Sequence, residues 1–106
     1  MIERGGVCWV EGSGHRSPAV VVQADSFNRS RIPTVVVVPL SNNLRLLDSP
    51  GNVLVPAHHS GLGKETVANV AQVLTLERRQ VRETPGRLPT VVLQAVAAGL
   101  ELVLGL

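Results

Sequence analysis

Residues 33–40 read PTVVVVPL, and this run of valines is the stretch that decides the fold. Valine is β-branched and favours strands, and an unbroken apolar run is typical of a strand that is covered on both faces. Residues 6–10 (GVCWV), 18–23 (PAVVVQ) and 53–56 (VLVP) are shorter segments of the same kind, and 66–76 (TVANVAQVLTL) alternates well enough to form one or two strands. A barrel-like sheet of about five to seven short strands is therefore expected.

Polar and turn-forming segments separate these strands. They are, in chain order, the turn at 11–14 (EGSG) and the polar connections at 25–32, 41–52 and 57–65. Residues 78–87 (RRQVRETPGR) are rich in charge and contain a Pro-Gly pair, so they are interpreted as a charged turn region.

The sequence changes character at Thr90. Its polar or small residues then recur at a helical spacing, and nearly all the other positions are Val, Leu or Ala. A helix that is apolar around most of its circumference must be covered on more than one side. Short strands cannot cover it fully, so contact with a second copy of the chain is expected; a deep groove within one chain is the alternative. The prediction is a single domain, residues 1–106, that is mainly β with a C-terminal helix.

Cysteine content and the chain ends indicate the compartment. Cys8 is the only cysteine, which excludes an intrachain disulfide and fits a reducing cytosol. The first residues, MIERGG, lack the apolar region of a signal peptide. Gln94, Gly99 and Glu101 interrupt the apolar tail, which favours a core helix over a membrane span. A cytoplasmic protein without membrane contact is expected.

The basic residues are mostly arginine. The formal net charge is +2 and the isoelectric point about 9.5, and Lys64 is the only lysine. The guanidinium fork fits a phosphate better than an ammonium does, so the balance agrees with phosphate recognition. Codon usage that favours arginine explains it equally well.

Metal and cofactor sites have little support in the sequence. His58 and His59 are adjacent, so in an extended segment they would point to opposite faces, and no Cys, Asp or Glu stands beside them at ligand spacing. Cys8 alternates with apolar neighbours and is interpreted as a small core residue. No phosphate-binding loop, dinucleotide fingerprint or nucleophile elbow is present, so we expect neither metal nor cofactor.

Chemistry is concentrated in two loops. Segment 13–18 (SGHRSP) carries His15 and Arg16, and segment 41–44 (SNNL) begins with Ser41. If the strands at 18–23 and 33–40 pair as an antiparallel hairpin, the start of one lies beside the end of the other. One rim would then hold a cation, a hydroxyl and amide donors, a set suited to a phosphate. A merely solvated rim is the alternative.

Several short segments, none specific alone, follow one another in a distinctive order. They are RGGVCWV at 4–10, GHRSPAVVVQAD at 14–25, FNRS at 27–30, PTVVVVPLSNN at 33–43, PGNVLVP at 50–56, GLGKETVANVAQV at 61–73, GRLP at 86–89 and LVLGL at 102–106. Together they cover nearly the whole chain, and the ordered set resembles the MazF/PemK family of bacterial toxins.

This resemblance implies an SH3-like barrel that forms a homodimer and is neutralised by a MazE-like antitoxin. It also implies metal-independent cleavage of single-stranded RNA, in which the ribose 2′-OH attacks the neighbouring phosphate and leaves a cyclic phosphate and a 5′-OH. Arg16 and Ser41 match the family's catalytic arginine and threonine. The residues implied to bind RNA are His15, Asn42, Asn43, Lys64, Asn69 and Gln72.

Three departures from the family pattern stand out. Ser17 separates Arg16 from Pro18, which are adjacent in the family; in a strand this shift turns Arg16 to the other face, whereas a loop absorbs it. The 11–14 turn is shorter than usual, and Gly6 replaces an aspartate.

Two other functions stay open. One is a gyrase-poisoning toxin of the CcdB type, for which a Trp-Gly-Ile tail is expected; this chain ends in Leu-Gly-Leu, and its only tryptophan is Trp9. The other is a catalytically inactive interaction module, which the inserted Ser17 would favour if it displaces Arg16.

Overall fold

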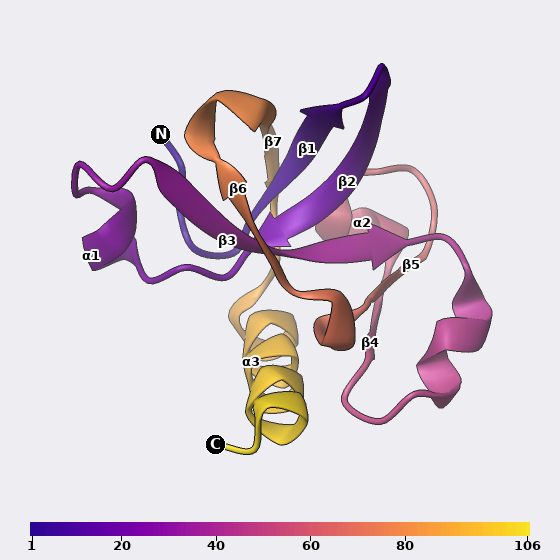
Figure 1. Cartoon of the computed structure of the whole chain (residues 1–106). Coiled ribbons are helices and arrows are strands. Elements are labelled where there is room, and N and C mark those ends of the chain that lie inside the picture. The colour runs from indigo at the N-terminus through magenta and orange to yellow at the C-terminus, as the bar shows by residue number, and fades with distance from the viewer.

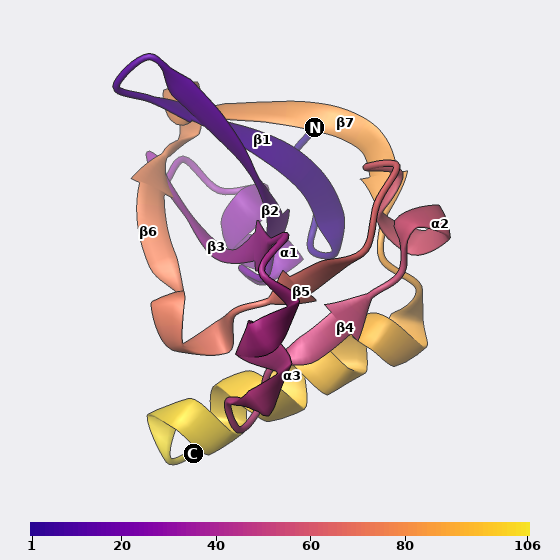
Figure 2. The same cartoon turned by 90° about the vertical axis from the view of Figure 1, so that its right-hand side faces the viewer.

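A computed structural model describes all 106 residues of the chain. Seven strands form one strongly curled sheet, and the long helix α3 (Thr90–Leu104) lies across one side of it (Figures 1 and 2). The strands are β1 (Gly6–Gly12), β2 (His15–Val21), β3 (Thr34–Ser41), β4 (Val53–Val55), β5 (Thr66–Ala68), β6 (Leu74–Glu77) and β7 (Val81–Arg87). The expected fold class, a mainly β barrel-like sheet with a C-terminal helix, is confirmed.

Strand β3, which contains the valine run, is the centre of the sheet. One of its edges pairs with β2, and the other pairs with β6 along its first half and with β5 at its end, all antiparallel. Val35 and Val37 point into one apolar cluster, and Val38 and Leu40 into another. The expectation that this strand is buried on both faces is therefore confirmed.

Two apolar cores lie on the two faces of the sheet. The helix-side core lies beneath α3 and consists of Val7, Val20, Val38, Leu40, Val55, Ala68, Val70, Leu88, Val92, Leu93 and Val96. The second core consists of Cys8, Ala19, Val21, Val35, Val37 and Val81. Cys8 is buried as predicted, and burial raises the pKa of its thiol to about 11.

The β1–β2 hairpin closes through a tight turn at Ser13 and Gly14, whose φ angles are 50° and 78°. Turns with positive φ at both central residues match the twist of an antiparallel ribbon, so the strands pair up to the turn itself. Strand β2 consequently begins at His15, before the predicted start at residue 18. Arg16 and Ser17 therefore lie in a strand, opposite Glu11 and Val10, and not in a loop.

The interpretation of residues 78–87 as a turn region is wrong. They form a short 3₁₀ helix, η3 (Arg78–Gln80), and the strand β7, which pairs with β1. Because β7 is an edge strand, its charged side chains face solvent and the missing N–H of Pro85 is tolerated. Gly86 permits a close approach: a Cβ there would lie 2.3 Å from the carbonyl oxygen of Ser60.

Short helices occupy the segments expected to be irregular. They are α1 (Asp25–Asn28), α2 (Ala57–Ser60) and the 3₁₀ helix η1 (Leu44–Asp48). A further 3₁₀ helix, η2 (Val70–Gln72), divides residues 66–76, so this stretch forms two strands, β5 and β6.

Helix α3 begins at Thr90, as predicted, and ends at Leu104; it is capped by Gly105, which has a left-handed conformation with a φ of 72°. Its buried side chains pack on the helix-side core. Large apolar side chains remain exposed at its two ends and just beyond, namely Val91, Leu102, Val103, Leu104 and Leu106. No helix in the structure combines the length and apolar character that a membrane crossing requires.

Candidate functional site

The start of β2, the end of β3 and the start of β5 line a cavity of about 340 Å³, here called the strand-end cavity. The predicted antiparallel pairing of β2 with β3 is observed, with Ala19 opposite Pro39. Arg16 and Ser41 therefore line the same cavity, together with Asn42. Lys64, which precedes β5, completes the group, because β5 pairs with the end of β3.

The two cations of the strand-end cavity are not paired with any carboxylate of the chain. The side chains of Arg16 and Lys64 make neither a hydrogen bond nor an ion pair with the rest of the chain. Glu11, directly opposite Arg16, is instead paired with Arg82, at 3.0 Å between nitrogen and oxygen. Two unpaired cations beside a hydroxyl and an amide make a site suited to a phosphate group.

The guanidinium of Arg16 lies over the indole ring of Trp9. Its guanidinium carbon lies 4.4 Å from the ring centroid of Trp9, within the range of a cation–π contact. Trp9 was not among the predicted site residues. The register that sets Trp9 opposite Pro18, two residues from Arg16 on the same strand face, depends on the two-residue turn at Ser13 and Gly14, so no local sequence pattern indicated it.

Arg16 and Ser41 approach the strand-end cavity from opposite faces of the strands. Arg16 alternates with Pro18 and Val20, which face the helix-side core. Ser17 and Ser41 fall on the other face, and continuing the observed β2–β3 register by two residues sets them opposite one another. The sequence left open whether a loop absorbs the Ser17 insertion. Both residues lie in a strand, so no loop absorbs it, and the alternation of the strand places Arg16 on the face of Trp9.

The turn that follows β3 is fixed by its own side chains. The Ser41 hydroxyl oxygen accepts a hydrogen bond from the Asn43 N–H at 3.1 Å. The Asn43 side chain accepts one from the Arg45 N–H at 3.2 Å and so caps η1. The Ser41 hydrogen remains available for an acceptor outside the chain.

The other predicted RNA-binding residues lie apart. His15 is exposed beside the hairpin turn, in a shallow hollow adjoining Arg16. Asn69 is buried and accepts a hydrogen bond from the Asn52 amide at 3.3 Å, which is a structural role. Gln72 is exposed on η2, outside the strand-end cavity. Thr66 lines the cavity, has a buried hydroxyl without a partner, and was missed because only the β3–β5 pairing places it there.

The adjacent histidines do not point to opposite faces. His58 and His59 lie on the one-turn helix α2, with ring centroids 4.1 Å apart and planes tilted by 59°. The expectation of opposite faces was wrong because it assumed an extended segment. No group of three or more His, Cys, Asp or Glu side chains forms a cluster that could hold a metal ion.

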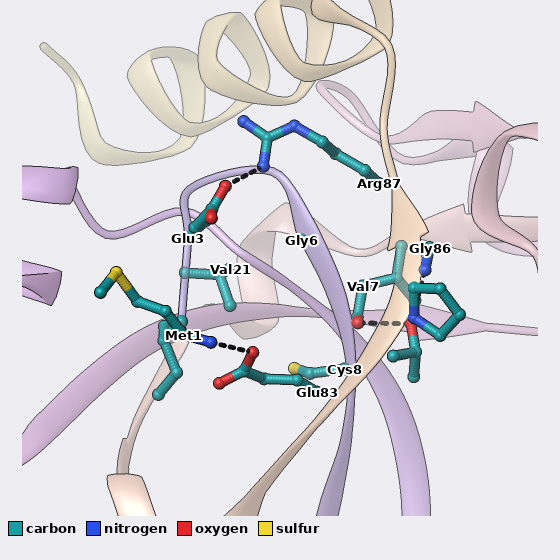
Figure 3. Close-up of a pocket in the computed structure, with 12 residues that line it drawn as sticks. Met1, Glu3, Gly6, Val7, Cys8, Val21, Glu83, Gly86 and Arg87 are labelled. Atoms are coloured by element: carbon teal, nitrogen blue, oxygen red, sulfur yellow. Dashed lines mark hydrogen bonds and ion pairs between the residues drawn. The ribbon is translucent and has the colours of Figure 1, made fainter.

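A second cavity, of about 290 Å³, lies beneath the N-terminal segment (Figure 3). The Met1 amine donates to Glu83 at 2.6 Å, and Arg87 pairs with Glu3 at 2.7 Å. The hydrogen bond to Glu83 raises the pKa of the amine. Since the cations at this cavity are already paired, the strand-end cavity is the better candidate for an anionic ligand.

Comparisons with known proteins match one family over nearly the whole chain. Residues 3–104 match the family of PemK-like, MazF-like toxins of type II toxin-antitoxin systems. Endoribonuclease MazF2 of Mycobacterium bovis and endoribonuclease MazF6 of Mycobacterium tuberculosis are each 35% identical over 91 residues, which cover 86% of this chain and 80% of the relative.

Solved structures share the fold at lower identity. An endoribonuclease in complex with its cognate antitoxin, from a mycobacterial species, has a TM-score of 0.81 at 23% identity, covering 98% of this chain and 95% of that one. A MazE–MazF complex from Deinococcus radiodurans has a TM-score of 0.80, with the same identity and coverage. The Mycobacterium tuberculosis toxin MazF-mt6 has a TM-score of 0.82 at 18% identity, covering 95% and 97%. On the family match and the curated relatives, the chain belongs to the PemK-like, MazF-like toxins of type II toxin-antitoxin systems.

Proposed function

We propose that this chain is an endoribonuclease toxin that cleaves single-stranded RNA at the strand-end cavity. The observation that carries the proposal is the presence of two unpaired cations, Arg16 and Lys64, in one cavity with the Ser41 hydroxyl. Neither side chain is engaged by a carboxylate of the chain, so both cations are available to an anionic ligand in this cavity. Because the curated relatives are named endoribonucleases, we propose that this anionic ligand is RNA.

In the proposed reaction the ribose 2′-oxygen attacks the adjacent phosphorus. The bond from phosphorus to the 5′-oxygen breaks, the 2′-OH loses its proton and the leaving oxygen gains one. The products are a 2′,3′-cyclic phosphate and a 5′-OH. The phosphate gathers negative charge in the transition state, which the Arg16 guanidinium would stabilise, and Ser41 would donate a hydrogen bond to a non-bridging oxygen. Arginine stays protonated in proteins, so Arg16 is assigned charge stabilisation and not the role of base.

Purified protein mixed with a long single-stranded RNA tests this proposal. Cleavage should persist in excess EDTA, and the downstream products should accept a labelled phosphate from polynucleotide kinase without prior phosphatase treatment, since they begin with a 5′-OH. Arg16→Ala should slow cleavage by about 10²-fold or more. Arg31→Ala is the matched control, because Arg31 is an exposed, unpaired arginine between α1 and β3.

The same experiment identifies the alternatives. A parent protein that leaves RNA intact would contradict the proposed activity and favour the inactive interaction module. If Arg16→Ala cleaves as fast as the parent, the assignment of Arg16 is wrong and its neighbour His15 becomes the next residue to test.

A homodimer, an antitoxin and a cytoplasmic location complete the proposal. The exposed apolar side chains around the end of α3 need cover, and a second copy of the chain would provide it. Two of the solved structures are toxin–antitoxin complexes, and an extended acidic segment would suit the free arginines here. Cellular RNA and a reduced, buried Cys8 both agree with the cytoplasm.

A further inference from the structure

We propose that Trp9 is the positioning residue of Arg16: its indole face holds the guanidinium on the helix-side face of the sheet and leaves the N–H groups free for an RNA phosphate. The identity of the ligand, RNA, rests on the proposed function. The contact between the two side chains is independent of it: the guanidinium carbon of Arg16 lies 4.4 Å from the ring centroid of Trp9.

The backbone explains why these two side chains meet. Trp9 is fixed on both sides of β1, opposite Pro18 in β2 and opposite Arg82 in β7. Arg16 lies two residues before Pro18 on the same strand face, so it is the diagonal neighbour of Trp9 across the hairpin. Half-burial of the indole between two strands makes it a rigid platform, whereas Arg16 itself is exposed near the turn.

Contact through the ring face leaves the guanidinium able to bind. A carboxylate partner would occupy the N–H groups that a phosphate needs, and Glu11, directly opposite Arg16 in the hairpin, is engaged by Arg82. In the cation–π contact the ring of Trp9 supplies no carboxylate to pair with the guanidinium, so the five N–H donors are not bound by an acidic partner. Arg16 is thus oriented in advance, which reduces the entropy lost when it closes on a substrate.

Kinetics of four variants test the positioning role. Trp9→Leu should lower kcat on a single-stranded RNA by about fivefold, with KM nearly unchanged, and Trp9→Phe should recover most of the loss because it keeps an aromatic face. In a protein that already carries Arg16→Ala, Trp9→Leu should not lower kcat any further. Phe27→Leu is the control: Phe27 is the only other aromatic residue, exposed on α1 at the far end of β3 (Figure 1).

A nuclear magnetic resonance measurement needs no RNA. Ring current should displace the Arg16 Nε–H and neighbouring proton resonances in the parent, less in Trp9→Phe and not in Trp9→Leu. Thermal melting of each variant shows whether it is folded. A single-stranded DNA of matching sequence, which lacks the attacking 2′-OH, should bind the parent and Trp9→Leu about equally, in agreement with a nearly unchanged KM.

Three results would overturn the proposal. Equal loss from Trp9→Leu with and without Arg16 would mean that Trp9 meets the RNA directly. Faster cleavage by Trp9→Leu would mean that the indole keeps Arg16 away from the reacting phosphate. Unchanged Arg16 resonances in Trp9→Leu would exclude the contact. If the parent cleaves no RNA, the proposed function fails, and the resonances still decide whether Trp9 holds Arg16.

Discussion

Among single side chains, Arg16 is the one whose proposed role depends most on the planar geometry of its charged group. Its planar fork meets a phosphate with two parallel donors, whereas a lysine ammonium is a mobile point charge. Arg16→Lys should therefore recover little of the activity lost in Arg16→Ala, in RNA cleavage assays under identical salt. Near-parent activity of the lysine variant would show that only charge matters, and that neither the fork nor its aromatic platform contributes.

Ser41 offers a milder test. Its oxygen accepts the hydrogen bond of the Asn43 N–H, and its hydrogen is free for a phosphate oxygen. Ser41→Thr keeps both groups and should keep the rate of RNA cleavage. Ser41→Ala should lower the rate by less than Arg16→Ala does, because a neutral donor stabilises charge less than a cation. Equal rates for the serine and alanine proteins would remove Ser41 from the reaction.

The two faces of strand β2 can be tested separately, by placing a guanidinium on the face of Ser41 as well as on the face of Trp9. Ser17 falls on the same strand face as Ser41, while Arg16 falls on the face of Trp9. Ser17→Arg adds a second guanidinium on the Ser41 side without removing the first, and we expect it to raise the cleavage rate. Ser49→Arg is the control, since Ser49 is, like Ser17, an exposed serine but does not line the cavity. A rate below that of the parent would show that the phosphate lies only on the Trp9 side.

Helix α3 contains a glycine whose replacement should act against the usual trend. Alanine in place of a helical glycine normally stabilises by about 0.5–1 kcal/mol. At Gly99, however, a Cβ would lie 2.1 Å from the carbonyl oxygen of Gly51. We expect Gly99→Ala to destabilise by about 1–3 kcal/mol, measured by thermal unfolding. Gln94→Ala, on the exposed face of the same helix, should leave Tm nearly unchanged; equal behaviour of the two variants would contradict this packing.

The sequence indicated elements best where one physical signal dominates. The valine run of β3 and the helical spacing after Thr90 predict their elements because burial and periodicity agree. Strand β7 was missed because it is an edge strand whose side chains are mostly charged, so it lacks an apolar pattern. The early start of β2 was missed because it depends on the φ angles of Ser13 and Gly14, and serine seldom adopts a positive φ.

At the scale of the whole molecule, the exposed apolar end of α3 predicts self-association. Sedimentation at micromolar concentration should give a dimer, because large apolar side chains exposed at the end of one helix favour burial. Leu102→Glu should shift the protein toward monomer, since it places a charge in the contact. Glu101→Gln, one residue earlier and also exposed, should not. A parent protein that sediments as a monomer would rule out the proposed dimer.

The candidate site was predictable only in part. Residues that neighbouring strands bring together could be predicted, whereas residues from distant segments could not. Arg16 and Ser41 were brought together by one hairpin, whose pairing follows from neighbouring strands. Thr66 lies at the site because β5 pairs with the end of β3, a contact between distant segments that no local pattern encodes. Asn69 and Gln72 follow Thr66 closely in sequence, yet they lie outside the cavity because the chain turns away through η2.

The pairing of β7 with β1 has a consequence for how the protein is made. The first strand of the chain finds its second partner only when residues 81–87 exist, and the strand-end cavity is incomplete until Lys64 and β5 have joined β3. Such closure between remote segments is slow compared with hairpin formation. On a ribosome, the early strands emerge first and lack both partners. Most of the message has therefore been read before the newly made chain can assemble the cavity proposed to cut RNA.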